Sequence, residues 1–114
     1  NALKEFLLIA KSLKVRKILA VATSAVRDAP NKSDFLLRVK RELGINIKVI
    51  DGEKEAFFGG VAAANLLYEK NGVTIDIGGG STELAVIKKK NIVKTISLKL
   101  GTVRLKELFF DKND

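Results

Sequence analysis

VTIDIGGGSTELAV, residues 73–86, decides the fold class of this chain. Two apolar, β-branched runs flank three consecutive glycines, with Asp76 before the glycines and Ser81, Thr82 and Glu83 after them. The order predicts a strand, a turn and a second strand, because β-branched residues favour strands and glycine interrupts them. A tight turn rarely needs more than about two glycines. The surplus indicates a backbone that must be approached closely by another group.

The same turn is a candidate phosphate site. Exposed N–H groups of Gly78–Gly80 can form a concave anion nest, and the hydroxyls of Ser81 and Thr82 add donors. Carboxylates on both sides, Asp76 and Glu83, are natural ligands for a divalent cation that bridges to phosphate oxygens. A purely structural turn is the alternative for the glycines taken alone. The P-loop and Rossmann patterns are both excluded, since no lysine follows the glycines and the turn does not open a helix.

The composition limits the chemistry. The chain has 114 residues, a 46% hydrophobic content and no apolar run long enough to cross a bilayer, which is typical of one ordinary domain. Cysteine is absent, which fits a reducing cytoplasm and excludes disulfides and cysteine-bound zinc. Histidine is absent too, so any catalytic base must be a carboxylate. The net charge of +8 favours polyanionic partners, or else reflects a solvated, lysine-rich surface.

The absence of methionine suggests a piece of a longer protein. Periodicity and turn residues predict an alternating α/β half with a parallel sheet, followed by an antiparallel meander and a helix. Ser33 is the expected N-cap of the second helix, and residues 23–31 are expected to form a loop. The boundary between the two halves falls near residues 52–72. The predicted elements are helices at 2–13, 33–43, 53–68 and 103–110, and strands at 17–23, 45–50, 73–77, 83–87 and 92–98.

The helix at residues 53–68 contains both large and small apolar side chains. Its large residues are the expected core contacts, whereas its small residues would let another backbone pack closely. The expected core residues are Phe57, Phe58, Val61 and Leu66.

Two further segments carry charged candidates. Arg27 follows a predicted parallel strand, where open α/β sheets bind ligands, and its guanidinium can hold phosphate through two hydrogen bonds. A solvated pair with Asp28 is the structural alternative. Glu53 and Glu55 fall in the first turn of a predicted helix, where the helix dipole favours acidic residues. A carboxylate at this place could also orient a water molecule.

Together, ATSAVRDAPN at 22–31, GEKEA at 52–56 and TIDIGGGSTEL at 74–84 resemble the Ppx/GppA family of exopolyphosphatases and guanosine pentaphosphate phosphohydrolases. The resemblance covers nearly all of the chain. It implies an α/β fold of the actin-like (ribonuclease H-like) type, with two lobes and an active site between them. Residues 1–54 would form the second half of lobe I. Residues 55–114 would form the connecting helix and the opening β-meander and helix of lobe II.

The resemblance also implies site roles. Glu55 would be the general base for the attacking water, with Glu53 a weaker candidate, and Arg27 would match the arginine of the family's loop. Asp76 and Glu83 would bind Mg²⁺, and Glu83 would also take part in catalysis. The implied phosphate contacts are Gly78, Gly79, Gly80, Ser81 and Thr82. Substrates would be polyphosphate or guanosine pentaphosphate, in a cytoplasmic protein without membrane attachment that could form a homodimer.

One family feature is missing: this chain has no N-terminal phosphate loop of the D-x-G-S type. The isolated chain is therefore expected to have little or no hydrolase activity. Two other functions remain open at the level of sequence. One is an actin-like, ATP-dependent kinase of small metabolites. The other is a basic module that binds alarmones or other polyanions through charges such as those of Lys88–Lys90, although specific nucleic-acid binding is not expected.

Overall fold

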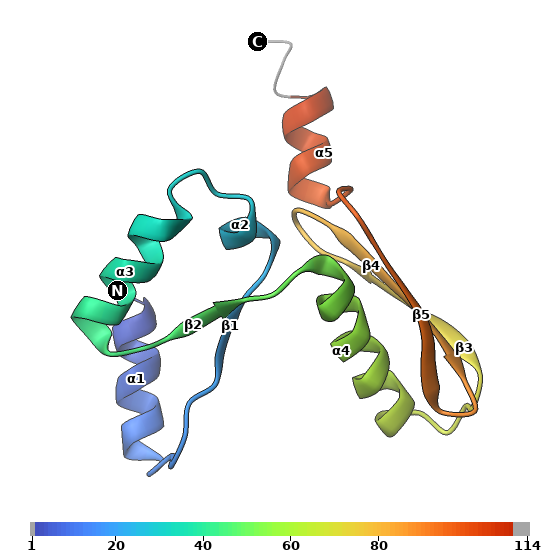
Figure 1. Ribbon diagram of the computed structural model, residues 1–114, viewed down its shortest axis with the longest axis horizontal. Coiled ribbons are helices and arrows are strands. Elements are labelled where there is room, and N and C mark those ends of the chain that lie inside the picture. The colour runs from blue at the N-terminus through green and yellow to red at the C-terminus, as the bar shows by residue number, and fades with distance from the viewer. Residues whose placement is uncertain (1, 111–114) are drawn as a thin grey trace.

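The computed structural model describes residues 2–110, which form two α/β halves joined by one helix (Figure 1). The molecule is a thin slab of 48 × 43 × 20 Å. No helix in the described part of the chain is both long and apolar enough to cross a membrane. The elements are, in chain order, α1 (Ala2–Ser12), β1 (Ala20–Ala22), α2 (Ser24–Arg27), α3 (Lys32–Leu43), β2 (Ile47–Val49), α4 (Gly52–Leu66), β3 (Gly72–Ile77), β4 (Thr82–Lys88), β5 (Asn91–Leu98) and α5 (Thr102–Phe109).

The N-terminal half contains the predicted parallel pair. Strands β1 and β2 run parallel, with Ala20 opposite Ile47, and α3 forms the crossover between them. Helix α3 ends at Gly44, whose φ of 68° is left-handed, as its glycine predicted.

Two local predictions in this half were wrong. Residues 23–31 are not all loop, because a short helix, α2, starts after Thr23. Its first turn closes with the N–H of Arg27 donating to the carbonyl of Thr23 over 2.8 Å. Ser33 is not an N-cap, since α3 begins at Lys32 and its N-cap position is Asn31, two residues earlier. The tight turn around Pro30 shortens the connection, with the N–H of Lys32 donating to the carbonyl of Ala29.

The C-terminal half is the predicted meander. Its sheet has the order β3-β4-β5 with antiparallel neighbours, and α4 packs across β4 and β5. The register places Asp76 opposite Glu83, and Glu83 opposite Ser97. Because opposite residues share a face, these three side chains form one row across the sheet. This row lies on the face that α4 covers, since Gly52 of α4 approaches both Ser97 and Glu83.

The contact between α4 and the sheet corrects the predicted core. Ala56 and Ala64 of α4 are buried, whereas Phe57, Phe58 and Leu66 are 44%, 48% and 81% exposed. The small residues face the sheet because a helix can approach strands closely only where its side chains are small. A Cβ on Gly60 would lie 2.8 Å from the Cβ of Ala85 in β4. The large side chains therefore point away from this interface.

Candidate active site

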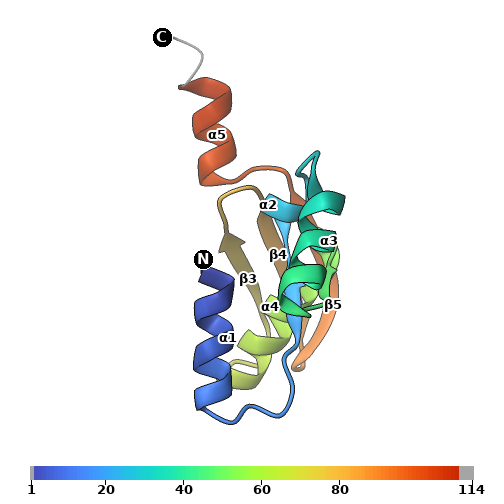
Figure 2. The same ribbon diagram turned by 90° about the vertical axis from the view of Figure 1, so that its left-hand side faces the viewer.

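The three glycines between β3 and β4 are needed because neighbouring segments lie very close to this loop. Within residues 2–110 the only glycine with a positive φ is Gly44, so the conformation of Gly78–Gly80 is open to other residues. A Cβ on Gly80 would lie 2.6 Å from the Oγ of Ser24, and one on Gly79 would lie 3.3 Å from Val103. The close approach expected from the surplus of glycine is thus made by α2 on one side and α5 on the other (Figure 2).

The polar groups of this loop point in two directions. The carbonyl of Gly78 accepts from the N–H of Thr102 over 3.0 Å, and that of Gly79 accepts from Val103 and Arg104 over 2.9 and 3.1 Å. The loop carbonyls therefore bind the first N–H groups of α5, which a helix cannot satisfy internally. The N–H groups of Gly79 and Gly80 donate to no acceptor within the described residues. Free amides beside each other are what an anion nest requires.

Glu83 is a carboxylate held in the interior. It is 3% exposed, and its Oε1 accepts a hydrogen bond of 2.8 Å from the Oγ of Ser97. Gly52 lets the start of α4 lie over this pair, because a Cβ there would be 2.1 Å from the same Oγ and 3.6 Å from Oε1. The positive end of a 15-residue helix near a buried carboxylate offsets part of its desolvation.

Asp76 and Glu83 are two carboxylates that could hold a divalent cation. They face each other across β3 and β4, and Asp76 is exposed while Glu83 keeps its second carboxylate oxygen free of any hydrogen bond within residues 2–110. No group of three or more acidic side chains in the described part of the chain could hold a metal by itself. Mg²⁺ commonly needs only one or two carboxylates, because water and substrate phosphates complete its shell.

The two hydroxyl residues after the glycines differ in placement. Ser81 is 3% exposed, and its carbonyl accepts from the N–H of Gly78 to close the loop. Thr82 lies on the sheet face opposite to Glu83, because successive side chains alternate. Its hydroxyl donates to the carbonyl of Leu100. The structure thus brings Ser81 to the loop and directs the Thr82 side chain away from it.

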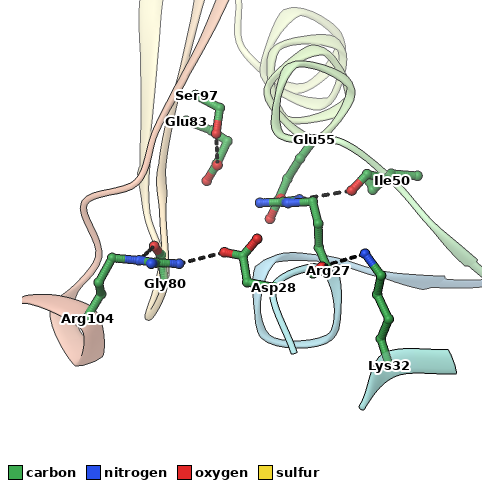
Figure 3. A network of polar contacts seen from close by, with 9 residues as sticks. All are labelled: Arg27, Asp28, Lys32, Ile50, Glu55, Gly80, Glu83, Ser97 and Arg104. Atoms are coloured by element: carbon green, nitrogen blue, oxygen red, sulfur yellow. Dashed lines mark hydrogen bonds and ion pairs between the residues drawn. The ribbon is translucent and has the colours of Figure 1, made fainter. Parts of the chain in front are cut away.

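Arg27 and Glu55 form an ion pair at the end of β1 (Figure 3). The Nη1 of Arg27 donates to the Oε2 of Glu55 over 3.0 Å and to the carbonyl of Ile50 over 2.9 Å. The two side chains are 19% and 21% exposed, so the pair is shielded but reachable. Glu53, two residues earlier, is exposed. The structure therefore separates the two glutamates of the GEKEA segment.

Asp28 is not the partner of Arg27, contrary to the structural alternative for that arginine. Its Oδ2 instead pairs with the Nη2 of Arg104 over 2.5 Å, and the Nε of Arg104 donates to the carbonyl of Gly80 over 2.8 Å. Figure 3 shows that the contacts of Arg27 go to Ile50 and Glu55, whereas the contact of Asp28 goes to Arg104 beside Gly80. A cavity of about 690 Å³ lies beside this second pair, with Ser24, Gly80 and Arg104 in its wall.

Sequence reasoning missed Ser24, Ser97 and Arg104. Ser97 could have been found by register, because the predicted strands place it opposite Glu83 in an antiparallel meander. The only sequence feature that pointed to Arg104 was its position just after Gly101 and the last predicted strand. Ser24 lies in the ATSAVRDAPN segment, but nothing local indicated its contact with Gly80, since that contact joins segments far apart in the chain.

A sequence model of the Ppx/GppA phosphatase family matches residues 1–114. The chain belongs to this family. Its Ppx/GppA relatives include exopolyphosphatase 1 of Mycobacterium bovis, 36% identical over 92% of this chain and 31% of that protein. Another similar protein is the bifunctional 3-dehydroquinate synthase/phosphatase of Fusobacterium nucleatum, 40% identical over 90% of this chain and 16% of that protein.

Solved structures agree with this assignment. The Ppx/GppA family member from Aquifex aeolicus is 41% identical, with a TM-score of 0.79 over 96% of this chain and 36% of that structure. The predicted α/β fold class is confirmed by this match, and the chain has the fold of a Ppx/GppA family member. The chain spans about a third or less of the length of the relatives it matches.

Proposed function

We propose that this chain supplies one side of the active site of an exopolyphosphatase-type phosphohydrolase, which releases terminal phosphate from inorganic polyphosphate. The observation that carries the proposal is the shielded Arg27–Glu55 pair, set beside a loop with free amides in a member of a phosphatase family. Hydrolysis of a phosphoanhydride needs a positioned water and donors aimed at the phosphoryl oxygens. The pair and the loop provide these two functions.

Each residue has a role in this proposal. Glu55 accepts a proton from the attacking water at a carboxylate oxygen, because the chain contains no histidine for that purpose. Arg27 fixes the direction of that carboxylate through Nη1, and its remaining N–H groups can donate to a phosphoryl oxygen. The amides of Gly79 and Gly80 bind oxygens of the terminal phosphate. Ser81 closes the loop that holds them.

Asp76 and Glu83 are the proposed magnesium ligands. Bound there, Mg²⁺ would neutralise negative charge on the phosphoryl oxygens. Ser97 holds one oxygen of Glu83 and leaves the other available. Thr82 is omitted from the proposed phosphate ligands, because its hydroxyl donates to Leu100 on the other face of the sheet.

Guanosine pentaphosphate is the second proposed substrate, since its terminal phosphate presents the same chemistry. The ATP-dependent kinase and the basic binding module gain no support from the site. Lys88–Lys90 lie at the end of β4 opposite to the glycine loop, and the ammonium of Lys90 donates to the carbonyls of Ala64 and Leu67. A cytoplasmic location and a homodimeric state belong to the same proposal, and cell fractionation and light scattering test them.

We also propose that residues 1–114 alone turn over little substrate. The chain holds one phosphate loop, whereas the family resemblance implies a second loop of the D-x-G-S type on the facing side. Phosphate release by the 114-residue chain, compared with a complete family polypeptide that contains it, tests this. Equal turnover by the two would contradict the proposal.

Glu55→Gln tests the proposed base, with Glu53→Gln as the matched control in the same helical turn. Both are made in the complete polypeptide and assayed for phosphate release from long-chain polyphosphate with Mg²⁺. Glu55→Gln should lower kcat by about 100-fold or more, the range for loss of a general base, while polyphosphate binding persists. Glu53→Gln should retain near-normal turnover because its side chain is exposed. Near-normal kcat in Glu55→Gln, or equal losses in both variants, would overturn the assignment.

A further inference from the structure

We infer that Arg104 is a positioning residue of this site, which holds the glycine loop in place and keeps Asp28 away from Arg27. The inference rests on the proposed phosphohydrolase function. Arg104 belongs to α5, outside every motif that the sequence singled out. Its contacts connect three segments that meet only in the folded chain.

The first two contacts fix the loop. The backbone N–H of Arg104 donates to the carbonyl of Gly79 over 3.1 Å, and its Nε donates to the carbonyl of Gly80 over 2.8 Å. Binding both carbonyls from one side determines which way the two peptide groups turn. Since the N–H of a peptide points opposite to its carbonyl, the contact to Gly79 orients the amide of Gly80, which we assign to phosphate, and the contact to Gly80 orients the amide of Ser81.

The third contact reaches the other half of the molecule. The Nη2 of Arg104 pairs with the Oδ2 of Asp28 over 2.5 Å, across 76 residues of sequence. The two side chains are 30% and 33% exposed, so the pair is partly shielded from solvent. It lies near a place where the two segments are already in close contact, since a Cβ on Gly80 would meet the Oγ of Ser24 at 2.6 Å. Arg104 thus joins the loop to Asp28, the C-cap of α2, while Ser24 at the start of α2 contacts Gly80.

The charge of Arg104 also determines the pairing of its neighbours. Arg27 and Asp28 are consecutive, and each bonds to a different element, Arg27 to Glu55 of α4 and Asp28 to Arg104 of α5. Without Arg104, the carboxylate of Asp28 would be left unpaired beside Arg27 and could compete with Glu55 for it. An unpaired carboxylate at this place would also repel a polyphosphate chain. The two functions of Arg104 therefore predict separate kinetic effects.

The test is steady-state kinetics of phosphate release by the complete polypeptide with polyphosphate. Arg104→Gln should lower kcat about tenfold through the loosened loop and raise KM about tenfold through the unpaired Asp28, as expected for loss of charge-assisted hydrogen bonds. Adding Asp28→Asn should restore KM to within about threefold of the wild type and leave kcat low. Asp28→Asn alone should change either constant less than about fivefold.

Two more variants distinguish positioning from general stabilisation. Arg104→Lys keeps a charge for Asp28 but lacks the planar fork needed to bind Gly80 as well, so KM should stay near normal while kcat falls. Lys99→Gln removes a nearby positive charge that has no hydrogen bond or ion pair to the loop or to Asp28 among the described residues, and it should leave both constants unchanged. Identical kinetics for Arg104→Gln and Lys99→Gln would overturn the inference. So would a double variant in which KM does not recover.

Hydrogen exchange gives a readout independent of activity. In Arg104→Gln, the amides of Thr102 and Val103 should exchange at least severalfold faster, because they donate to the carbonyls of Gly78 and Gly79 in the loop that the Arg104 side chain holds at Gly80. Unchanged exchange would count against the inference. If the wild type released no phosphate from either substrate, the proposed function would fail. Hydrogen exchange would still test whether Arg104 holds the glycine loop. If Arg104→Gln did not fold, Arg104→Lys and Asp28→Asn would carry the kinetic test.

Discussion

The two connections of the three-stranded sheet contrast in residue type and in backbone conformation. The β3–β4 connection contains Gly78–Gly80, none with a positive φ. The β4–β5 connection contains Lys89 and Lys90, whose φ values of 50° and 67° are left-handed. Glycine is the residue that adopts a positive φ without steric cost, and lysine is not. The sheet therefore uses each residue type where turn chemistry alone would predict the other.

The difference teaches what each connection is selected for. The glycines leave room for Ser24 and Val103 and expose amides, so the first connection allows other segments to approach closely. In the second, the ammonium of Lys90 donates to the carbonyls of Ala64 and Leu67 at the end of α4. A cation bound to the final carbonyls of a helix also interacts favourably with its dipole. This contact offsets the strain of the turn, so the second connection serves stability.

Adding a methyl group to the glycine loop should have the largest effect. Gly80→Ala places a Cβ 2.6 Å from the Oγ and 3.1 Å from the Cβ of Ser24, which forces α2 and the loop apart. Phosphate release by the complete polypeptide should fall by roughly 100-fold, as for small displacements of catalytic groups. Gly80→Ala combined with Ser24→Gly should recover much of this loss. Failure of the second substitution to help would show that the glycine is needed for a reason other than proximity.

Removing the lysine contact should have an intermediate effect, confined to stability. Lys90→Ala loses two hydrogen bonds to the end of α4 while the turn keeps its strained φ, so the protein should lose about 1–2 kcal/mol. Faster hydrogen exchange of the amides in the last turn of α4 would locate the effect. Normal kcat is expected, because this turn lies at the other end of β4 from the site. A large fall in kcat would contradict the assignment of the β4–β5 connection to stability alone.

Relieving the strain at Lys89 should have the smallest effect, of opposite sign. The side chain of Lys89 has no hydrogen bond or ion pair within residues 2–110, and glycine accepts its φ of 50° without cost. Lys89→Gly should therefore change the free energy of unfolding by less than about 1 kcal/mol, in the stabilising direction. Lys90→Gly is the matched control and should destabilise, because it relieves strain but loses the contact with α4. Chemical denaturation of the two variants measures the difference.

The sequence predicted most of the fold and the parts of the site that local chemistry encodes. The parallel pair, the meander and the end of α3 at Gly44 all follow from periodicity and turn residues. The buried face of α4 did not follow, because Phe57 and Ala56 are both apolar and only the approach of β4 and β5 favours the smaller residue. Helix-start chemistry does not distinguish Glu53 from Glu55; the family resemblance favoured Glu55, and in the structure Arg27 contacts only Glu55.

By itself, the sequence determined a glycine loop between two strands, carboxylates on both sides of it, and a chemistry without histidine or cysteine. These are properties of residue type and of neighbours along the chain. Only the tertiary structure decided that Arg27 pairs with Glu55, that Asp28 pairs with Arg104, and that Ser24 and Val103 are the groups that approach the glycines. The partners in these two pairs are separated in the sequence by 28 and 76 positions, respectively. Their partners are set by how the elements pack together, which no local pattern specifies.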